Sequence, residues 1–265
     1  MKRTDQTRSV FYVIILLYTE RIFMKIIISP AKGFKHFDDI KTEGLLFPEK
    51  TRVLLEKIRK LSMNEMGNLN RTNDKLTEKA YDDFQDFDFD DLPNPALFSF
   101  DGLVFKQFSM ADFDDLTYLN DHVYILDAFY GLLKPMTGIR DYRLYFDNTM
   151  YDLYEFWGDD LYKKLFEDGD LVLNLASKEY TKTLKPFLKE TDKFLTVDFK
   201  ENRDGKLKSV VSYTKQARGA MLREIISGKI EDVEEIKGLD VNGYVYDPYN
   251  STKDTLTFVR KGDEK

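Results

Sequence analysis

The sequence contains no cysteine, which excludes a disulfide framework, a thiolate metal site and thiol-based peroxide sensing. Its only two histidines, His36 and His122, lie far apart in the chain, so a zinc site would have to rely on carboxylates. We therefore predict no metal and no cofactor. With only 14 glycines and 7 prolines among 265 residues, collagen-like and low-complexity chains are also excluded.

Long hydrophobic runs are absent as well. The longest, residues 10–18, would be only about 14 Å long as a helix, against roughly 30 Å for a bilayer. It follows a basic stretch, as in a secretory signal, but no small-residue cleavage site comes after it. We interpret residues 1–23 as an apolar extension that is non-native or precedes a start at Met24, and expect the fold to survive its deletion. We expect a cytoplasmic protein with no membrane partner.

The composition is that of a folded chain with a sizeable core. Hydrophobic residues make up 42% of the sequence, aromatic residues 14% and charged residues 33%. The formal charge of −7 argues against a protein that coats nucleic acid with its whole surface. A local basic cleft remains compatible with that charge, because short-range fields depend on where the charges lie.

Strand and helix patterns alternate along the chain. Short apolar runs predict strands at 26–28, 122–126, 171–175, 244–246 and 255–259, and a hairpin pairs 193–200 with 206–213. Helical spacing predicts helices at 49–61 and 215–227, and another that starts at Ser62 with Glu65 completing a capping box. We therefore expect a single α/β or α+β domain over residues 24–265, with a mixed sheet.

An acidic stretch at residues 82–91 places aromatic residues between six aspartates. We interpret it as a solvated turn that Phe84, Phe87 and Phe89 attach to the core. The alternative, a calcium loop, lacks the glycine and the terminal glutamate of an EF-hand.

Polar clusters follow two of the predicted strands. Ser29 and Lys32 follow the first, while Asn174, Ser177 and their neighbours follow a later one. Ligands of open sheets bind outside the carboxyl ends of strands, although helix caps and surface charges are the simpler interpretation. The pocket candidates, with unknown catalytic roles, are Ser29, Lys32, Asp74, Lys75, Trp157, Asp159, Asn174, Ser177, Glu179 and Tyr180. We expect Trp157 to be partly buried at the rim of this pocket and to hold Asp159 in place.

Two further segments could contact phosphate. Residues 126–135 contain an apolar turn at Gly131 that could expose backbone N–H groups, with Lys134 and Arg143 nearby. The predicted helix 215–227 carries Lys215 and Arg218 on one side, after Lys206 and Lys208 on the preceding strand. A tight packing turn and a solvated helix face are the alternatives.

From Met24 to about Arg260 the chain resembles the YaaA family of peroxide-stress proteins. Seven motifs in the same order carry the resemblance: ISPAK at 28–32, NDKL at 73–76, FYGLLKP at 129–135, YRL at 142–144, LYEFWGD at 153–159, NLASKEY at 174–180 and KQARG at 215–219. The resemblance implies a single domain of unusual fold, a positively charged cleft and a helix-hairpin-helix element that binds duplex DNA without sequence preference. It also implies a role in limiting iron-dependent damage after peroxide exposure.

The helix-hairpin-helix would fall at residues 128–132, where relatives often carry a glycine in place of Ala128. The residues that would bind nucleic acid are Phe129, Tyr130, Gly131, Lys134, Arg143, Lys215 and Arg218. Our leading hypothesis is a DNA-binding stress protein. The alternative is an enzyme that acts on a nucleotide or modified nucleobase, and a third is a structural or partner-binding domain. A closed pocket apart from the basic helix would favour the enzyme, and a continuous basic groove would favour DNA binding.

Overall fold

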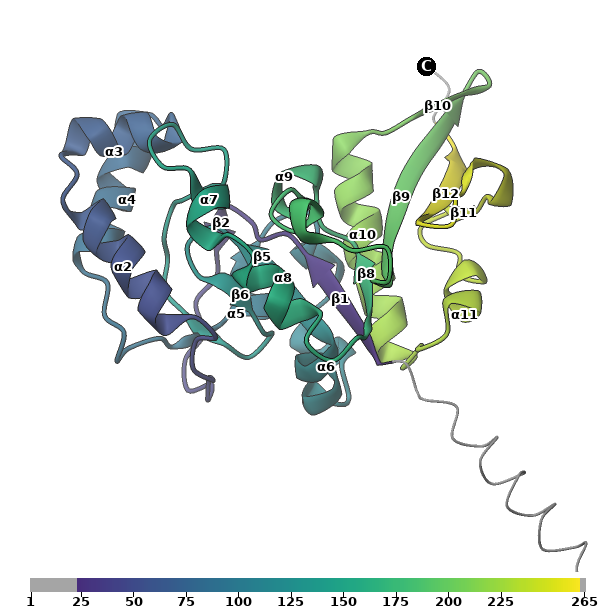
Figure 1. The fold of residues 1–265 in the computed structure, drawn as a ribbon, viewed down its shortest axis with the longest axis horizontal. Helices are drawn as coiled ribbons and strands as arrows, with labels where there is room; N and C mark the ends of the chain where they lie inside the picture. The colour runs from purple at the N-terminus through teal and green to yellow at the C-terminus, as the bar shows by residue number, and fades with distance from the viewer. Residues whose placement is uncertain (1–22, 263–265) are drawn as a thin grey trace, which may run out of the picture.

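The computed structural model describes residues 23–262 and places a mixed sheet at the centre of the molecule (Figure 1). Within these residues the sheet has eight strands in the order β11-β12-β9-β8-β1-β5-β6, with β10 paired to β9. The strands are β1 (Met24–Ile28), β5 (Val123–Asp127), β6 (Gly131–Leu133), β8 (Leu171–Asn174), β9 (Phe194–Arg203), β10 (Lys206–Lys208), β11 (Val245–Tyr246) and β12 (Thr255–Lys261). Two short pairs lie outside it: β2 (Gly33–Phe34) with β4 (Phe100–Asp101), and β3 (Asn94–Pro95) with β7 (Gly138–Ile139).

Five neighbouring strands run in the same direction. β1 pairs parallel to both β5 and β8, and β9 pairs parallel to both β8 and β12. The carboxyl ends of these strands therefore meet at one edge of the sheet. β6, β10 and β11 are antiparallel to their partners. The mixed sheet predicted from the alternation of elements is confirmed.

Helices surround the sheet and extend to one side of it. They are α2 (Pro48–Arg59), α3 (Met63–Asn70), α4 (Asp74–Gln85), α5 (Ala96–Ser99), α6 (Leu116–His122), α7 (Leu153–Trp157), α8 (Asp160–Leu165), α9 (Lys178–Thr181), α10 (Val211–Ser227) and α11 (Val233–Lys237). Figure 1 shows α2, α3, α4 and α7 as a lobe on one side of the molecule, and β9 with β10 as an arm on the other. No helix in residues 23–262 is long and apolar enough to cross a membrane.

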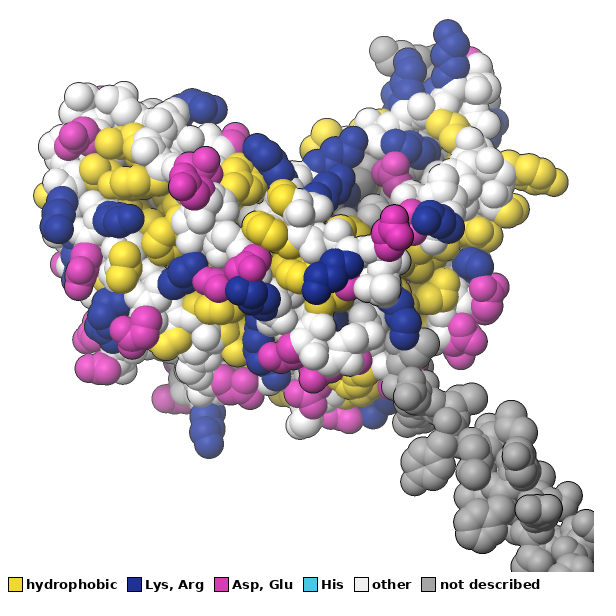
Figure 2. Space-filling view, viewed as in Figure 1, with side chains coloured by type: hydrophobic (Ala, Val, Ile, Leu, Met, Phe, Trp, Pro, Cys, Tyr) yellow, Lys and Arg dark blue, Asp and Glu magenta, His cyan; other side chains and the backbone are white. Residues whose placement is uncertain are grey.

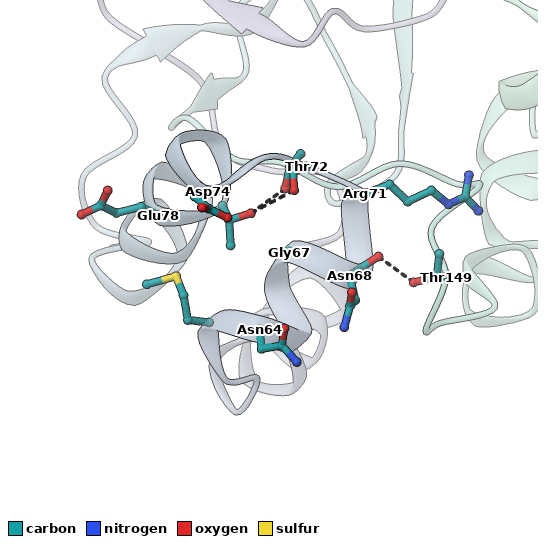
Figure 3. A pocket seen from close by; sticks show the side chains of 10 residues that line it. Asn64, Gly67, Asn68, Arg71, Thr72, Asp74, Glu78 and Thr149 are labelled. Atoms are coloured by element: carbon teal, nitrogen blue, oxygen red, sulfur yellow. Dashed lines mark hydrogen bonds between the residues drawn. The ribbon is translucent and has the colours of Figure 1, made fainter.

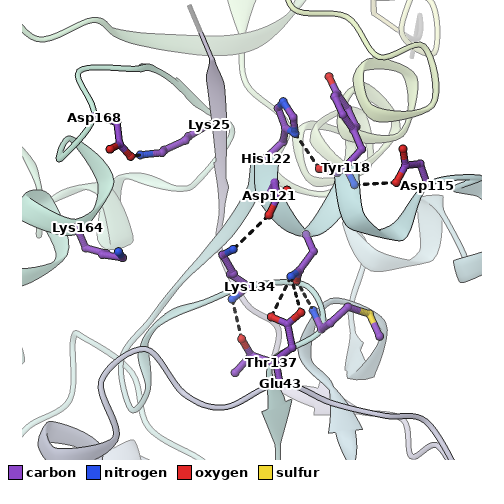
Figure 4. A network of polar contacts seen from close by, with 12 residues as sticks. Lys25, Glu43, Asp115, Tyr118, Asp121, His122, Lys134, Thr137, Lys164 and Asp168 are labelled. Atoms are coloured by element: carbon purple, nitrogen blue, oxygen red, sulfur yellow. Dashed lines mark hydrogen bonds and ion pairs between the residues drawn. The ribbon is translucent and has the colours of Figure 1, made fainter.

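The first strand, β1, shows why the sequence of a central strand is a nearly continuous apolar run. All five residues of β1 are buried, because neighbouring strands and helices cover both of its faces. Its one charged residue, Lys25, is matched from outside the strand: its Nζ lies 3.2 Å from Asp168 Oδ2 and 3.1 Å from Asp170 Oδ2 (Figure 4). It also donates a hydrogen bond to the carbonyl of Leu165. A buried ammonium needs such partners to offset its lost hydration.

Most of the predicted elements are confirmed. The five strands appear with shifts of one or two residues, and α2 and α10 match the two predicted helices. Ser62 and Glu65 form the predicted capping box at the start of α3. β9 and β10 form a hairpin at the predicted place, with Gly205 at a positive φ of 75° in its turn. Its second strand ends at Lys208 and not at residue 213, because α10 begins at Val211.

The prediction that residues 1–23 are an extension of the fold falls largely outside the described part of the chain, which begins at Phe23. Phe23 itself stacks on His122, with ring centroids 4.0 Å apart.

The acidic stretch at residues 82–91 was predicted to be a solvated turn attached to the core by its phenylalanines. The acidic stretch is helical as far as Gln85, where α4 ends, and Phe84 and Phe87 are buried as predicted. No group of acidic or histidine side chains in residues 23–262 is arranged to hold a metal ion.

The predicted helix-hairpin-helix at residues 128–132 is wrong. These residues form the turn and second strand of a β-hairpin in which β5 pairs antiparallel to β6. The turn depends on Asp127, whose Oδ1 accepts hydrogen bonds from the N–H groups of Phe129 and Tyr130, both 2.8 Å long. Ala128 is buried and has no positive φ, so alanine is not strained there.

Gly131 is a packing residue of this hairpin. Its φ is +81°, and a Cβ there would lie 2.7 Å from the ring of Trp157. We expect Gly131→Val to destabilise the protein by about 2–4 kcal/mol, because it adds backbone strain to a collision with a buried indole. Urea denaturation measures the loss, with Gly44→Ala as the control because a Cβ at Gly44 meets nothing within 4 Å. Equal stability of the two variants would contradict the packing role.

Candidate functional site

A cavity of about 410 Å³ lies at the carboxyl ends of β1 and β8. The segments that follow these two strands form its floor, the first half of α10 forms one wall, and the loops at 101–105 and 145–147 form the others. Its lining comprises Ser29, Pro30, Ala31, Lys32, Asp101, Gly102, Leu103, Val104, Phe105, Tyr145, Asp147, Leu175, Ser177, Glu179, Tyr180, Lys215 and Arg218. Its position is the one that open parallel sheets use for ligands.

Hydrogen bonds between the two strand ends hold the floor in place. The N–H of Ser177 donates to Ser29 Oγ at 2.8 Å, and the two hydroxyl oxygens are 3.4 Å apart. Asn174 lies beneath them, buried, where it accepts from the N–H of Ala176 and donates to Thr196. Asn174 is therefore a positioning residue for the loop that carries Ser177 and Glu179.

Helix α10 approaches the cavity closely because of one glycine. A Cβ on Gly219 would lie 2.0 Å from the carbonyl oxygen of Val104, in the loop that forms the opposite wall. This contact places Arg218 against the cavity. Arg218 Nε is buried and has no hydrogen-bond partner within residues 23–262, and burial lowers the pKa of its guanidinium.

Two carboxylates of the cavity also have buried oxygens without hydrogen-bond partners in the described chain, Oε1 of Glu179 and Oδ1 of Asp101. Lys106 forms an ion pair with Asp101 at the longer distance of 3.5 Å. Burial raises the pKa of Glu179, and the charge of Asp147 raises it further. The charge of Lys32 and the backbone N–H groups of Asp147 and Phe146 act in the opposite direction. Buried charged atoms without hydrogen-bond partners cost stability, so a small cavity lined by Arg218 Nε and Glu179 Oε1, together with an Asp101 Oδ1 that has only the long contact to Lys106, indicates a ligand.

A basic rim surrounds the opening. Lys32 places its ammonium 4.1 Å from the ring centroid of Tyr145, whose hydroxyl accepts a hydrogen bond of 2.6 Å from Arg143. Lys178 at the start of α9 and Lys215 on α10 are exposed. Figure 2 shows the face of the molecule hollowed between the lobe and the arm, with Lys and Arg side chains along the hollow and at the tip of the arm.

The structure brings together part of the predicted pocket. Five candidates line the cavity, namely Ser29, Lys32, Ser177, Glu179 and Tyr180, and Asn174 lies directly beneath it. Asp74 instead lines a separate pocket between α3 and α4, beside Glu78 and Arg71 (Figure 3). Lys75, also on α4, is exposed.

Trp157 and Asp159 are not at the rim of the cavity, contrary to our prediction. Trp157 is fully buried, donates from Nε1 to the carbonyl of Ala128 at 3.0 Å and packs against Phe47. Asp159 forms an ion pair with Lys163 at 2.8 Å. The indole therefore holds the β5–β6 hairpin rather than Asp159.

The residues predicted to bind nucleic acid are divided among three places. Phe129 and Tyr130 are fully buried in the core, as is the backbone around Gly131. Lys134 follows β6, which is antiparallel to β5, so it lies at the opposite edge of the sheet and pairs with Asp121 at 3.5 Å (Figure 4). Lys215 and Arg218 line the cavity, and Arg143 contacts it through Tyr145.

Sequence reasoning missed the loop at 101–105 and the acidic residue Asp147. The dipeptide Asp101-Gly102 is a turn signal that could have marked the loop, but not its place in space. Gly102 is required there because a Cβ would lie 2.8 Å from that of Ala31, on the floor of the cavity.

The fold and site together define an α/β protein with a polar cavity at the carboxyl edge of a mixed sheet. The chain belongs to the family described as peroxide stress protein YaaA, whose family model matches residues 24–250. Curated relatives named UPF0246 proteins match nearly their whole length. One from Ligilactobacillus salivarius is 38% identical over 89% of this chain and 100% of its own, one from Clostridioides difficile is 32% identical over 90% and 100%, and one from Lactobacillus johnsonii is 37% identical over 89% and 98%.

Proposed function

We propose that this peroxide stress family member binds duplex DNA without sequence preference in a basic notch. The notch is the hollow between the lobe and the arm (Figure 2). We assign to it six exposed lysines: Lys32, Lys178, Lys182, Lys206, Lys208 and Lys215. All six lie at the carboxyl edge of the sheet, because they follow β1, β8 or β9 or belong to α10.

The observation that supports this proposal is that all six lysines are exposed and none forms an ion pair within residues 23–262. Several other surface lysines form ion pairs with carboxylates: Lys79 pairs with Asp83 and Asp141, and Lys163 pairs with Asp159. These six positive charges therefore lie at one edge of the sheet in a chain whose net charge is −7. Such an arrangement attracts the phosphates of a duplex through local fields and counterion release.

The same binding would limit iron-dependent damage. Lysines that neutralise phosphates displace the cations condensed on the duplex, and ferrous iron is one of those cations. Less iron on the DNA means fewer hydroxyl radicals formed beside the bases when peroxide is present. This account needs no redox chemistry from a chain without cysteine.

The salt dependence of duplex binding tests the proposal. We expect log K to fall with log salt by about 0.9 for each phosphate neutralised. Lys208→Ala and Lys215→Ala should each flatten the slope by about 0.9 and weaken all duplex sequences alike.

The matched control is Lys193→Ala, which removes an exposed lysine just before β9, at the opposite edge of the sheet. It should leave the slope unchanged. A slope near zero for the parent protein, or equal slopes for all three variants, would contradict binding in the notch.

A second candidate function, an enzyme acting on a nucleotide or modified nucleobase, is favoured by Glu179. Burial raises the pKa of this carboxyl, and its Oε1 is buried in the cavity without a hydrogen-bond partner in the described chain. A carboxyl perturbed by burial in a cavity is a candidate for acid–base chemistry. The test is incubation with nucleotides and with DNA containing modified bases, followed by chromatography. Product formation that Glu179→Gln abolishes would support the enzyme, and the absence of any product would contradict it.

A further inference from the structure

We infer that the cavity binds a single nucleotide unit, with its phosphate at Arg218 and Lys215 and the polar edge of its base at Glu179 and Asp101. This inference rests on the proposed function, because it places the cavity at the base of the DNA-binding notch. The notch would contact the phosphates of a duplex, and the cavity beneath it would recognise one base together with its phosphate.

The cationic side of the cavity requires an anion. Arg218 has a buried Nε without a partner, and Lys215, one helical turn before it on α10, has no ion pair in the described chain. A guanidinium and an ammonium that line one cavity are the groups proteins use for phosphate. The negative charge of Asp198 opposes the effect of burial on the pKa of Arg218. No hydrogen bond joins the two side chains.

The acidic side requires hydrogen-bond donors on the same ligand. Oε1 of Glu179 and Oδ1 of Asp101 are buried and accept no hydrogen bond within residues 23–262, and both residues line the cavity. The Asp101 oxygen has only the 3.5 Å ion pair with Lys106. A simple anion such as inorganic phosphate would leave these oxygens unsatisfied and repelled. The amino and ring N–H groups of a nucleobase would satisfy them.

The shape and walls of the cavity agree with a base. Its volume of about 410 Å³ lies in the range of small-ligand sites. Phe105, Tyr145 and Tyr180 supply aromatic rings beside the polar groups, and a base can stack on such rings. The hydroxyls of Ser29 and Ser177 supply further hydrogen-bonding groups at the floor.

A nucleotide unit can come from two sources. It can be a free nucleoside monophosphate, or it can be an unpaired nucleotide of a duplex held in the notch, since the lysines of the notch and the cavity share Lys32 and Lys215. Taking an unpaired base out of a helix costs little compared with opening an intact pair. Both sources present the same phosphate and base edge to the cavity.

The experiment is calorimetric titration of the full chain with four nucleoside 5′-monophosphates, the matching nucleosides and inorganic phosphate. In parallel, an intact duplex is compared with a duplex containing one unpaired nucleotide. We expect at least one monophosphate to bind about tenfold or more tightly than phosphate and than its own nucleoside. Arg218→Met and Glu179→Gln should each weaken that binding by about 10–100-fold, because each removes a buried charged hydrogen bond.

The variants also separate the two sources and the two proposals. If the unit comes from DNA, Arg218→Met should abolish the preference for the duplex with the unpaired nucleotide while leaving the intact duplex bound. Monophosphate binding without any duplex binding would contradict the proposed function but support this inference. No monophosphate binding tighter than phosphate, or no effect of Glu179→Gln in a variant with the parent's melting temperature, would overturn it.

Discussion

Gly219→Ala is expected to destabilise the protein by about 3 kcal/mol or more, a larger loss than at any other glycine of the functional region. The new Cβ would lie 2.0 Å from the carbonyl oxygen of Val104 and 2.9 Å from Gln107 Cγ. A backbone carbonyl cannot move aside as a flexible side chain can, so α10 must shift outward as a unit. The intrinsic helix preference of alanine over glycine, about 1 kcal/mol, opposes the loss but is smaller.

This shift would also separate Arg218 from the other walls of the cavity. Urea denaturation gives the free energy of unfolding, and calorimetric titration with the nucleoside monophosphate that the parent protein binds gives the dissociation constant. Gly44→Ala serves as the control, because its Cβ would meet no atom within 4 Å. A Gly219→Ala protein as stable as that control would show that α10 does not depend on this close approach.

Asp127→Asn should become more stable relative to the parent as pH rises, by about 2.4 kcal/mol between pH 4 and pH 8. Asp127 is fully buried, and burial raises its pKa to about 6, although hydrogen bonds from Tyr130, Tyr142 and Phe129 oppose this. In the unfolded chain an Asp titrates near ~3.9. The folded pKa is the higher one, so the stability that this group contributes is complete below ~pH 3.9 and is lost as pH rises through 6.

An asparagine does not ionise and can bond to the same three groups, with the direction of the bond to Tyr142 reversed. Its oxygen can accept from the two N–H groups of the hairpin turn, and its amide can donate to the Tyr142 hydroxyl. Free energies of unfolding for the parent and variant at pH 4, 6 and 8 provide the measurement, and the pH 4 pair is the internal control. A difference that does not change with pH would mean that Asp127 keeps an ordinary pKa in the folded protein.

The site could be predicted where it depends on strand ends. Ser29 and Ser177 lie in polar segments that follow apolar runs, and parallel pairing of β1 and β8 brings such segments together. The rule that ligands bind at that edge needs only strand order and direction. Lys215 and Arg218 were also accessible to prediction, because helical spacing places them on one side of α10.

Other residues depend on tertiary contacts that the local pattern does not contain. Residues 128–133 are all apolar or aromatic except for Gly131, so they show neither the helical nor the strand periodicity. Such a run is compatible with a turn between helices as well as with a buried β-hairpin. That ambiguity misplaced Lys134, since an antiparallel β6 reverses the edge at which the chain emerges. Trp157 was misplaced because a glycine with a positive φ, distant in sequence, provides the surface on which it packs.

The most direct test of the account is lysine acetylation footprinting with and without a saturating duplex. We predict that the duplex protects Lys32, Lys178, Lys182, Lys206, Lys208 and Lys215 from modification by several-fold. Lys193 and Lys253, before β9 and β12 at the opposite edge of the sheet, should react equally with and without DNA. Protection at both edges alike, or at Lys193 and Lys253 alone, would contradict binding in the notch.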